Sequence, residues 1–454
     1  MRLRAWGTRS IRNRRTIATG VAVPLVLLAG CSGHTTPPKD VTQTSANLQA
    51  TVSCSSGENC RMYFKWGLAD GTLNQQTPTT SPVAGPVTDA KVNWPINGLQ
   101  PGKTYAYQVC GQAQAGQPFF CAGPDGLNNS KQEFTTLPNC TQTLAVGANI
   151  TTALQSAAAG AVICLSPGTH AVSGSPAIVS ANGTAAAPVT LTSADPQNPA
   201  TIHGRFVTHT PTKYLTIRHL RFTWNSSLAQ TAMVLAGTNV TLLHNDISGG
   251  GETICLNTSN SDGSHALTSS TIDHNRIHDC GNPNDPNPDI GAGDRGHAQG
   301  VYTNPGSADL TISNNWCYRV AARCYQERFG VDNEWHHNLA DYENWGYHFG
   351  DGNPAANTPR NNSMTWNISG PHHYRYTSSG FYHGGDLSVF GGGTNETFSN
   401  NCWQGETNGP LGNVTMSGNV VATPQFVDAP NGDFHLKMDS PCADYGPRGS
   451  TPGP

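Results

Sequence analysis

One short pattern recurs through the second half of the chain and restricts its fold more than any other feature. In most copies a threonine and an apolar residue come four and three places before an asparagine, as in "TLLHN" and "TIDHN". The asparagines that align in this way are Asn245, Asn275, Asn315, Asn338, Asn367, Asn401 and Asn419. Their spacing varies from 18 to 40 residues. A constant short strand with insertions of variable length between copies is typical of stacked coils.

The same pattern predicts how the coils are held together. Apolar positions in each copy alternate with polar ones, as a half-buried strand requires. Paired strands lie about 4.8 Å apart, so the amide of one asparagine can bond to the next along the stack. We therefore expect a parallel β-solenoid with an asparagine ladder at one corner, whose members are structural and not catalytic. Residues 214–222 fit the same frame with Leu220 in place of the asparagine.

Three further segments lead to a family resemblance. Residues 150–170 indicate a short amphipathic helix, an apolar strand and then Pro-Gly-Thr, while residues 182–193 and 423–446 resemble a first coil and a closing segment. Together with the ladder, they make residues 138–446 similar to a right-handed parallel β-helix of the pectate-lyase-like superfamily. The resemblance implies an all-β fold with capped ends. It implies no single activity, because this superfamily holds lyases, hydrolases, epimerases and purely binding proteins.

A smaller β-domain is expected ahead of the solenoid. Residues 41–137 contain short alternating strands such as "RMYFKWG". The stretch "LQPGKTYAYQV" resembles the strand-turn-strand of a fibronectin type III domain, where the tyrosine at the position of Tyr105 forms the tyrosine corner. Nothing in this segment has a catalytic pattern. We expect a small β-sandwich that acts as a spacer.

The N-terminus has the features of an export signal. Residues 1–30 hold several arginines and then an apolar run that is too short to span a membrane. The ending "LAGC" resembles the bacterial lipobox, which implies that Cys31 is lipidated. We expect residues 31–40 to be a polar linker and residues 447–454 a tail. The expected location is the extracellular face of the bacterial cell membrane, with the lipid anchor as the only attachment.

The cysteine count supports export. Of the 13 cysteines, twelve remain when Cys31 is set aside for lipid. An even number in an exported chain favours disulfides, and the absence of a C-x-x-C pair argues against zinc. Neighbouring cysteines offer a pairing, although sequence alone does not fix the connectivity. The neighbours are Cys54 with Cys60, Cys110 with Cys121, Cys140 with Cys164, Cys255 with Cys280, Cys317 with Cys324, and Cys402 with Cys442.

Composition restricts the partners. The formal net charge is −4, with 25 Lys and Arg against 29 Asp and Glu, so no basic face for nucleic acid is expected. Charged residues make up only 12% of the chain and glycines number 50, which favours turn-rich β-structure. Against this background, titratable residues crowd between positions 294 and 386. We therefore expect the functional site within this range.

A second strand in each coil predicts an exposed column. If Ile254, Val301, Cys324, Tyr347 and Phe381 point inward, their successors point outward. Those successors are Cys255, Tyr302, Tyr325, His348 and Tyr382. Rows of aromatic side chains with polar neighbours can stack on sugar rings, or they can simply stabilise the sheet.

The candidate site residues fall into two groups. The candidate catalytic residues are Asp294, His297, Arg323, Glu327, His348 and Asp351. The candidate substrate-binding residues are Gln299, Tyr302, Tyr325, Arg328, Tyr382 and His383.

Several chemistries fit these residue types. A uronate lyase needs a base and a positive group that holds the substrate carboxylate, which a histidine and an arginine can supply. A hydrolase needs two carboxylates about 5 to 9 Å apart. An epimerase would use the lyase groups and return the proton to the other face. The leading prediction is an enzyme acting on an extracellular polysaccharide, and the alternative is a non-catalytic carbohydrate-binding or adhesion protein. The oligomeric state stays open.

No cofactor or metal is expected from the sequence. The spacing of Asp285, Asn287 and Asp289 suits oxygen ligation of calcium. The loop departs from the EF-hand pattern, however, because Ile290 stands where glycine is required. A turn rich in Asn and Pro is therefore the favoured interpretation.

Overall fold

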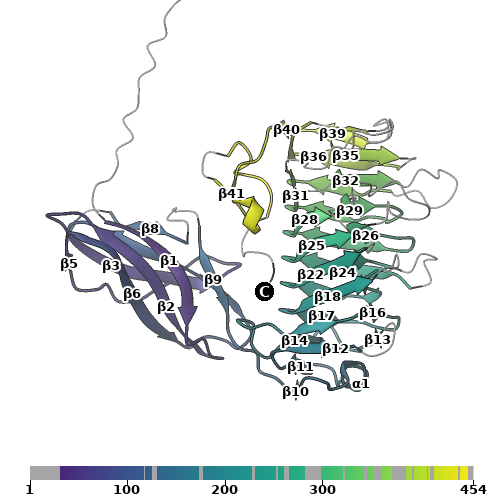
Figure 1. The fold of residues 1–454 in the computed structure, drawn as a ribbon, viewed down its shortest axis with the longest axis horizontal. Coiled ribbons are helices and arrows are strands. Elements are labelled where there is room, and N and C mark those ends of the chain that lie inside the picture. Colours follow the sequence, from purple (N-terminus) through teal and green to yellow (C-terminus); the bar gives the residue numbers. More distant parts are fainter. Residues whose placement is uncertain are drawn as a thin grey trace, which may run out of the picture.

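The computed structural model describes most of the chain after the first thirty residues. It describes residues 31–116, 118–124, 130–172, 177–226, 231–251, 254–259, 265–281, 298–320, 323–341, 345–350, 360–370, 385–390, 393–405, 407–408, 414–437, 440–447 and 453. A tall stack of parallel strands stands beside a smaller two-sheet domain (Figure 1). The helices of the described residues include none that is long and apolar enough to cross a membrane.

Three parallel sheets, here called sheets I, II and III, run the length of the stack. Sheet I contains β10 (Gln142–Leu144), β11 (Val162–Leu165), β14 (Val189–Ser193), β17 (Leu215–Arg218), β21 (Thr241–Leu243), β24 (Leu267–Asp273), β27 (Ala308–Ser313), β30 (Glu334–His336), β33 (Ser363–Thr365), β36 (Glu396–Ser399) and β39 (Val414–Ser417), with β20 (Gly237–Thr238) pairing to β24. Sheet II contains β12 (Thr169–Ala171), β15 (Thr201–His203), β18 (Arg221–Ser226), β22 (Asp246–Gly251), β25 (Arg276–Gly281), β28 (Trp316–Val320), β31 (Leu339–Asp341), β34 (Ile368–Ser369), β37 (Cys402–Trp403) and β40 (Val420–Val421). Sheet III contains β13 (Ala177–Val179), β16 (Phe206–Thr208), β19 (Met233–Val234), β23 (Leu256–Asn257), β26 (Gln299–Thr303), β29 (Arg323–Glu327), β32 (Trp345–Gly350), β35 (Gly385–Phe390) and β38 (Thr407–Asn408).

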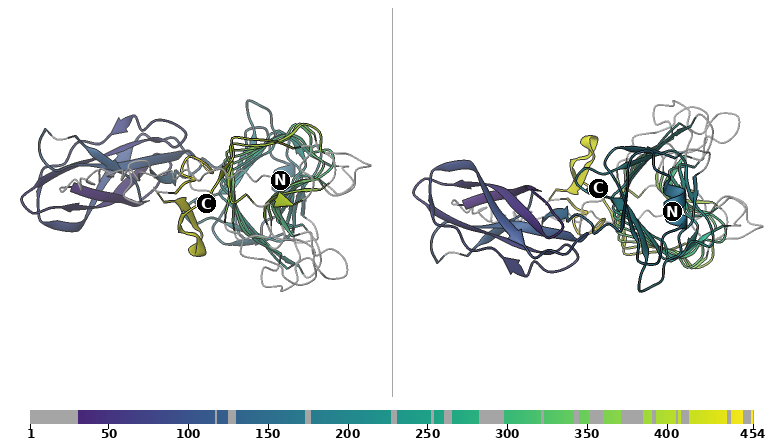
Figure 2. Two further views of the ribbon diagram at one scale, coloured as in Figure 1. Left: turned by 90° about the horizontal axis from the view of Figure 1, so that it is seen from above. Right: turned by 90° about the horizontal axis from the view of Figure 1, so that it is seen from below.

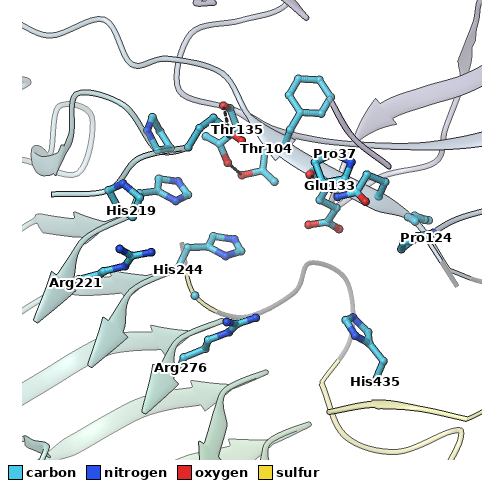
Figure 3. Close-up of a pocket in the computed structure, with 17 residues that line it drawn as sticks. Pro37, Thr104, Pro124, Glu133, Thr135, His219, Arg221, His244, Arg276 and His435 are labelled. Carbon is cyan, nitrogen blue, oxygen red and sulfur yellow. Dashed lines mark hydrogen bonds between the residues drawn. The ribbon is translucent and has the colours of Figure 1, made fainter. Parts of the chain in front are cut away.

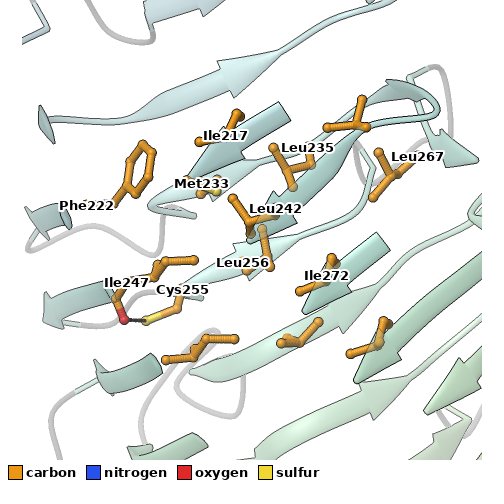
Figure 4. Packing of buried hydrophobic residues seen from close by; sticks show 14 of the residues in the cluster. Ile217, Phe222, Met233, Leu235, Leu242, Ile247, Cys255, Leu256, Leu267 and Ile272 are labelled. Carbon is orange, nitrogen blue, oxygen red and sulfur yellow. Dashed lines mark hydrogen bonds between the residues drawn. The ribbon is translucent and has the colours of Figure 1, made fainter. Parts of the chain in front are cut away.

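The core lies inside these three sheets, because each strand sends an apolar residue inward in register with its neighbours. Leu242 of β21 pairs with Ile272 of β24, which pairs with Ile312 of β27. Ile247 of sheet II and Leu256 of sheet III meet this line in one continuous cluster (Figure 4). Seen along the axis, the strands of the three sheets surround a common interior (Figure 2). The predicted right-handed parallel β-helix is confirmed.

The asparagine ladder fills the corner between sheets I and II. Each rung donates from Nδ2 to Oδ1 of the next asparagine over 3.0 to 3.2 Å, from Asn245 through to Asn419. The residue before each rung is often left-handed, as at His244 and His274, with φ values of 52° and 51°. Asparagine and histidine tolerate this conformation better than most residues, and it turns the chain from one sheet to the next. All seven predicted rungs are confirmed, and the backbone nitrogen of Leu220 donates to Asn245.

The two ends of the β-helix domain differ. At the N-terminal end α1 (Ile150–Gln155) buries Ile150, Ala153 and Leu154, and the Asn149 side chain accepts a hydrogen bond from the backbone nitrogen of Thr152. The helix therefore covers the first coils, as the sequence predicts (Figure 1).

The C-terminal segment does not close the far end of the stack as a cap would. Its elements β41 (Phe426–Asp428), η3 (Ala429–Asn431) and β42 (Asp433–Leu436) fold back along the outer face of sheet II. The rings of Phe434 and Tyr318 are 4.7 Å apart between centroids. Figures 1 and 2 place this segment between the β-helix and the smaller domain. The apolar outer residues of sheet II, among them Leu339 and Ile368, explain why it packs there.

The smaller domain is a sandwich of two antiparallel sheets around its own apolar core. One sheet contains β1 (Cys31–Lys39), β2 (Ser45–Cys54) and β6 (Val87–Asn97). The other contains β3 (Asn59–Leu68), β4 (Gln75–Gln76), β5 (Val83–Ala84), β7 (Thr104–Gln112), β8 (Phe120–Ala122) and β9 (Gln132–Thr135). The hydroxyl of Tyr105 accepts a hydrogen bond from the backbone nitrogen of Gln100, 2.9 Å away, which is the contact expected of a tyrosine corner.

The predicted linker over residues 31–40 is wrong. Residues 31–39 form β1, which pairs with β2 along most of its length. Pro37 and Pro38 suggested a linker, but β1 is an edge strand and its register shifts between Thr36 and Lys39. Proline is tolerated at such a place because an edge strand can lack a donor there.

All six expected disulfides are present. They join Cys54 to Cys60, Cys110 to Cys121, Cys140 to Cys164, Cys255 to Cys280, Cys317 to Cys324, and Cys402 to Cys442. Cys31 alone is outside these pairs. Two of the bridges tie sheet II to the start of a sheet III strand, and the last fastens the C-terminal segment to the β-helix.

Candidate functional site

The outer face of sheet III carries a column of polar side chains. Its inward positions are in register through Leu256, Val301, Tyr325 and Tyr347. The next residue in each strand points the other way. These outward residues, here called the outer column, are Asn257, Tyr302, Gln326 and His348.

Side-chain hydrogen bonds link the outer column from coil to coil. Gln299 donates from Nε2 to Oε1 of Gln326 over 3.1 Å, and Gln326 donates to the carbonyl of Gly350 over 3.3 Å. One coil earlier, Asn304 donates to Oδ1 of Asn257 over 3.0 Å. The predicted residue Gln299 thus belongs to one network with Gln326 of the next coil.

Two arginines border the outer column. The guanidinium of Arg328 lies over the ring of Tyr302 with its carbon 5.6 Å from the ring centroid, and 4.7 Å from that of Phe329. Arg323 opens strand β29, and its charge acts on His348 in the next coil. Both arginines are half-buried, so they are the part of this site that solvent reaches. The other members are covered, with exposed fractions of 4% for Tyr302 and 2% for His348.

His348 is held as a neutral imidazole. Its Nε2 lies 2.7 Å from the carbonyl oxygen of Gly350. Because a carbonyl only accepts, Nε2 carries the proton in this contact. Burial, with the charge of Arg323 adding to it, holds the pKa of His348 well below its usual value. A neutral imidazole beside a guanidinium is suited to accept a proton from a carbon next to a bound carboxylate.

Two residues expected to point outward lie inside the β-helix. Tyr325 is fully buried, and its hydroxyl is 3.1 Å from the carbonyl oxygens of both Asn315 and Leu339. Cys255 is buried in the same core. In each case the preceding corner turns two successive residues inward: Cys324 and Tyr325 in one coil, and Cys255 and Leu256 in another. The predicted substrate-binding role of Tyr325 is therefore wrong.

Glu327 is a structural carboxylate, which corrects its predicted catalytic role. It accepts hydrogen bonds from Thr303 Oγ1 at 2.6 Å, the Gly330 backbone at 2.6 Å, Asn333 Nδ2 at 2.9 Å and Trp335 Nε1 at 3.2 Å. The residue is fully buried, and burial raises its pKa despite these donors. Its oxygens are committed to the protein itself.

The partners of Glu327 define a second polar corner that the sequence did not indicate. The Oδ1 atom of Asn333 accepts from the backbone of Leu310, and that of Asn362 accepts from the backbone of Asn333, both over 2.9 Å. Asn362 then donates to Glu396 over 3.3 Å. This shorter ladder lies ahead of the sheet I strands and explains why a carboxylate is buried there.

Several predicted residues lie outside the described part of the chain. They are Asp294, His297, Asp351, Tyr382 and His383, together with the loop considered for calcium. Within the described residues the group spaced to hold a metal ion is Cys54, Glu58 and Cys60, whose two cysteines are joined as a disulfide. That group therefore offers no metal site.

Gln326 and Asn257 are members of the outer column that the sequence did not single out. The missing information was the register at the corner after Cys317. Once Tyr325 is aligned with Val301 instead of with Tyr302, Gln326 falls next to Tyr302. The polar side chain of Gln326, directly after Cys324 and Tyr325, was the available indication.

No protein-family model and no curated protein matches the chain. Among solved structures, an alginate lyase from a Paenibacillus species is similar at 14% identity with a TM-score of 0.35, over 62% of this chain and 100% of that one. A family 28 exopolygalacturonase from Yersinia enterocolitica is similar at 9% identity with a TM-score of 0.20, over 85% of this chain and 97% of that one.

A third similarity is to the sensor domain of an anti-sigma factor in Pseudobacteroides cellulosolvens. It has 21% identity and a TM-score of 0.18, and it covers 24% of this chain and 98% of that one. At these identities and TM-scores the similarities carry no argument about activity. The chain is a parallel β-helix protein by its own sheet topology.

Proposed function

We propose that the outer face of sheet III binds an acidic polysaccharide and cleaves it by β-elimination. The observation that carries this proposal is the orientation of His348, whose Nε2 lies 2.7 Å from the carbonyl oxygen of Gly350, on a face that also bears Arg323, Tyr302 and Arg328. Arg323 would neutralise the uronate carboxylate and so acidify the adjacent C–H. His348 would take that proton, the electron pair of the C–H bond would form the C=C bond, and the departing oxygen would take a proton from water.

Elimination is preferred to hydrolysis because of where the described carboxylates lie. A hydrolase needs two carboxyl groups facing one sugar. Glu327 is enclosed by four donors from the protein, so it is not available for that role. The half-buried Arg328 and the ring of Tyr302 beneath it instead supply a positive charge and an aromatic surface, which suit an acidic sugar.

The test is to incubate the protein with polyguluronate, polymannuronate, polygalacturonate and a neutral glucan. We expect ultraviolet-absorbing unsaturated ends from at least one polyuronate and none from the glucan. His348→Ala should abolish this product. His203→Ala is the matched control, because His203 is an exposed histidine on the outer face of sheet II and should leave the rate unchanged.

Two outcomes would overturn the proposed chemistry. New reducing ends without ultraviolet absorbance would indicate a hydrolase. Saturable binding without any product would indicate a carbohydrate-binding or adhesion protein, the alternative class.

We also propose that the sandwich is a fibronectin type III-like spacer and that Cys31 is lipidated at the cell surface. The Tyr105 contact and the exclusion of Cys31 from the disulfides support this. Cys31 is the first residue of β1 and is half-buried, so a lipid on its sulfur would have to lie at the edge of the sandwich. Cys31→Ser should move the protein from the detergent phase to the aqueous phase in a detergent partition of whole cells. An unchanged partition would contradict lipidation.

A further inference from the structure

A cleft separates the sandwich from the β-helix, away from sheet III. Its volume is about 520 Å³, within the range of about 300–1,000 Å³ usual for ligand sites. His219, His244, Arg221 and Arg276 lie on the β-helix side, and Glu133 and Thr135 of strand β9 lie on the sandwich side (Figure 3). His435 of the C-terminal segment also borders it.

The cleft is positive in a chain whose net charge is −4. Its lining includes Lys131, Arg221 and Arg276 against the one carboxylate of Glu133, which gives +2 before any histidine is protonated. His219 adds no charge, because burial and the neighbouring His244 and Arg218 hold its pKa well below the usual value. Cationic side chains on both sides of a cleft, with few counter-charges, concentrate an electric field that attracts anions.

The two arginines of the cleft occupy defined positions on sheet II. Arg221, Asp246 and Arg276 are in register on successive strands. Asp246 partly offsets their charge, but it also bonds to His278 over 3.1 Å. The guanidinium of Arg276 lies over the ring of Trp316, 5.3 Å from the centroid. The charge of Arg276 also acts on Asp246 and Asp433, and its planar group of N–H donors matches the two oxygens of a carboxylate.

Contacts across the domain boundary hold the cleft open. Arg218 donates to the carbonyl of Gly102 over 2.8 Å, and Gln197 donates to the carbonyl of Thr135 over 3.4 Å. On the β-helix side the rings of His219 and His244 are stacked with centroids 5.3 Å apart. The walls are therefore formed before a ligand arrives.

We infer that this cleft is a second binding site, for an acidic oligosaccharide of about two to three sugar residues. Arginine edges would pair with carboxylates of the ligand, while the stacked imidazoles and the polar side chains of the sandwich would contact its rings and hydroxyls. The anionic character of the ligand follows from the lining residues. The choice of a uronate rests on the proposed function of sheet III.

Calorimetric titration of the full chain with trigalacturonate tests this inference, with galactotriose and inorganic phosphate as comparison ligands. His348→Ala is the background in each titration, so that no turnover occurs. We expect Arg221→Ala/Arg276→Ala to weaken trigalacturonate binding at least about tenfold. Arg360→Ala removes an exposed arginine that does not line the cleft and should change affinity less than about twofold.

Arg221→Gln alone separates loss of charge from loss of folding, because Arg221 is exposed and its replacement leaves the core intact. It should weaken binding with an unchanged circular dichroism spectrum. Equal affinity for galactotriose, equal affinity for phosphate, or no effect of the double arginine variant would each overturn the inference. Product formation in the Arg221→Ala/Arg276→Ala variant shows separately whether the sheet III proposal stands.

Discussion

Two lines of polar side chains run along the β-helix, and they differ in almost every respect. The ladder repeats one residue type with one geometry, and each asparagine between its two ends accepts from the rung before it and donates to the rung after it. The outer column changes from Asn257 to Tyr302, Gln326 and His348 over four coils. Uniform repetition is what a buried corner needs, because the same backbone groups recur at every coil. A ligand-binding site instead needs different side chains at successive positions of a rigid scaffold.

The largest expected effect comes from replacing one buried asparagine of the ladder. Asn338 donates to Ile312 and Asn367 and accepts from Asn315. Asn338→Ala leaves several of these groups buried and unpaired, at about 1–3 kcal/mol each, so we expect a loss of about 4 kcal/mol in the free energy of unfolding. The measurement is urea unfolding of the β-helix followed by circular dichroism.

Asn419→Ala is the matched control for the rung, because Asn419 ends the ladder and is only partly buried. Its cost should be about 1 kcal/mol. Equal losses for the two variants would show that the ladder does not act as a continuous buried unit.

The outer face of sheet II differs from the ladder and the outer column, because it carries a histidine, His278, whose pKa is raised. Burial disfavours the charge on His278, but the hydrogen bonds and charges of Asp246 and Asp279 outweigh it and raise the pKa to about 8. Because this exceeds the unfolded value of about 6.5, the stabilisation is complete below about pH 6.5 and is lost as the pH rises through about 8. We expect stability to fall by about 2 kcal/mol across this window.

His278→Gln is the control for the pH effect. It should flatten the dependence of the unfolding midpoint between pH 6.5 and pH 8, the unfolded and folded pKa values of His278. A slope of the same size in the variant would assign the pH dependence to another group.

The smallest expected effect concerns two tyrosines of sheet III, one inside the β-helix and one in the outer column. Tyr325→Phe removes a hydroxyl that bonds to carbonyls inside the core, so it should cost about 1 kcal/mol of stability. It should leave polyuronate binding unchanged. Tyr302→Ala should instead weaken polyuronate binding, because its ring belongs to the outer column. Denaturation and calorimetric titration of both variants check this pair, and the opposite assignment would mean that the register places the wrong tyrosine outside.

The repeats explain how much of the fold was predictable. The asparagines, the apolar frame and the neighbouring cysteines recur at positions that sequence alone reveals, so the solenoid, its ladder and its disulfides followed. Strict alternation failed at corners, where Cys324 and Tyr325 both turn inward. The linker predicted from Pro37 and Pro38 was wrong for another reason, because an edge strand tolerates proline there.

The site was less predictable than the fold for a physical reason. Glu327 looks like a catalytic carboxylate in sequence, yet a second ladder that appears only in three dimensions encloses it. Arg221 and Arg276 are 55 positions apart and two coils apart, so nothing local indicated that they share a cleft with the sandwich. Contacts between coils and between domains decide such roles.

Hydrogen–deuterium exchange of the Arg221→Ala/Arg276→Ala variant, with and without polyuronate, tests whether the polysaccharide binds to sheet III. With cleft binding removed, ligand should slow exchange in β26, β29 and β32, where the outer column lies. Exchange in the sheet I strands should stay unchanged. Protection confined to the sandwich or to sheet II, with β26, β29 and β32 unaffected, would contradict the assignment of the polysaccharide site to sheet III.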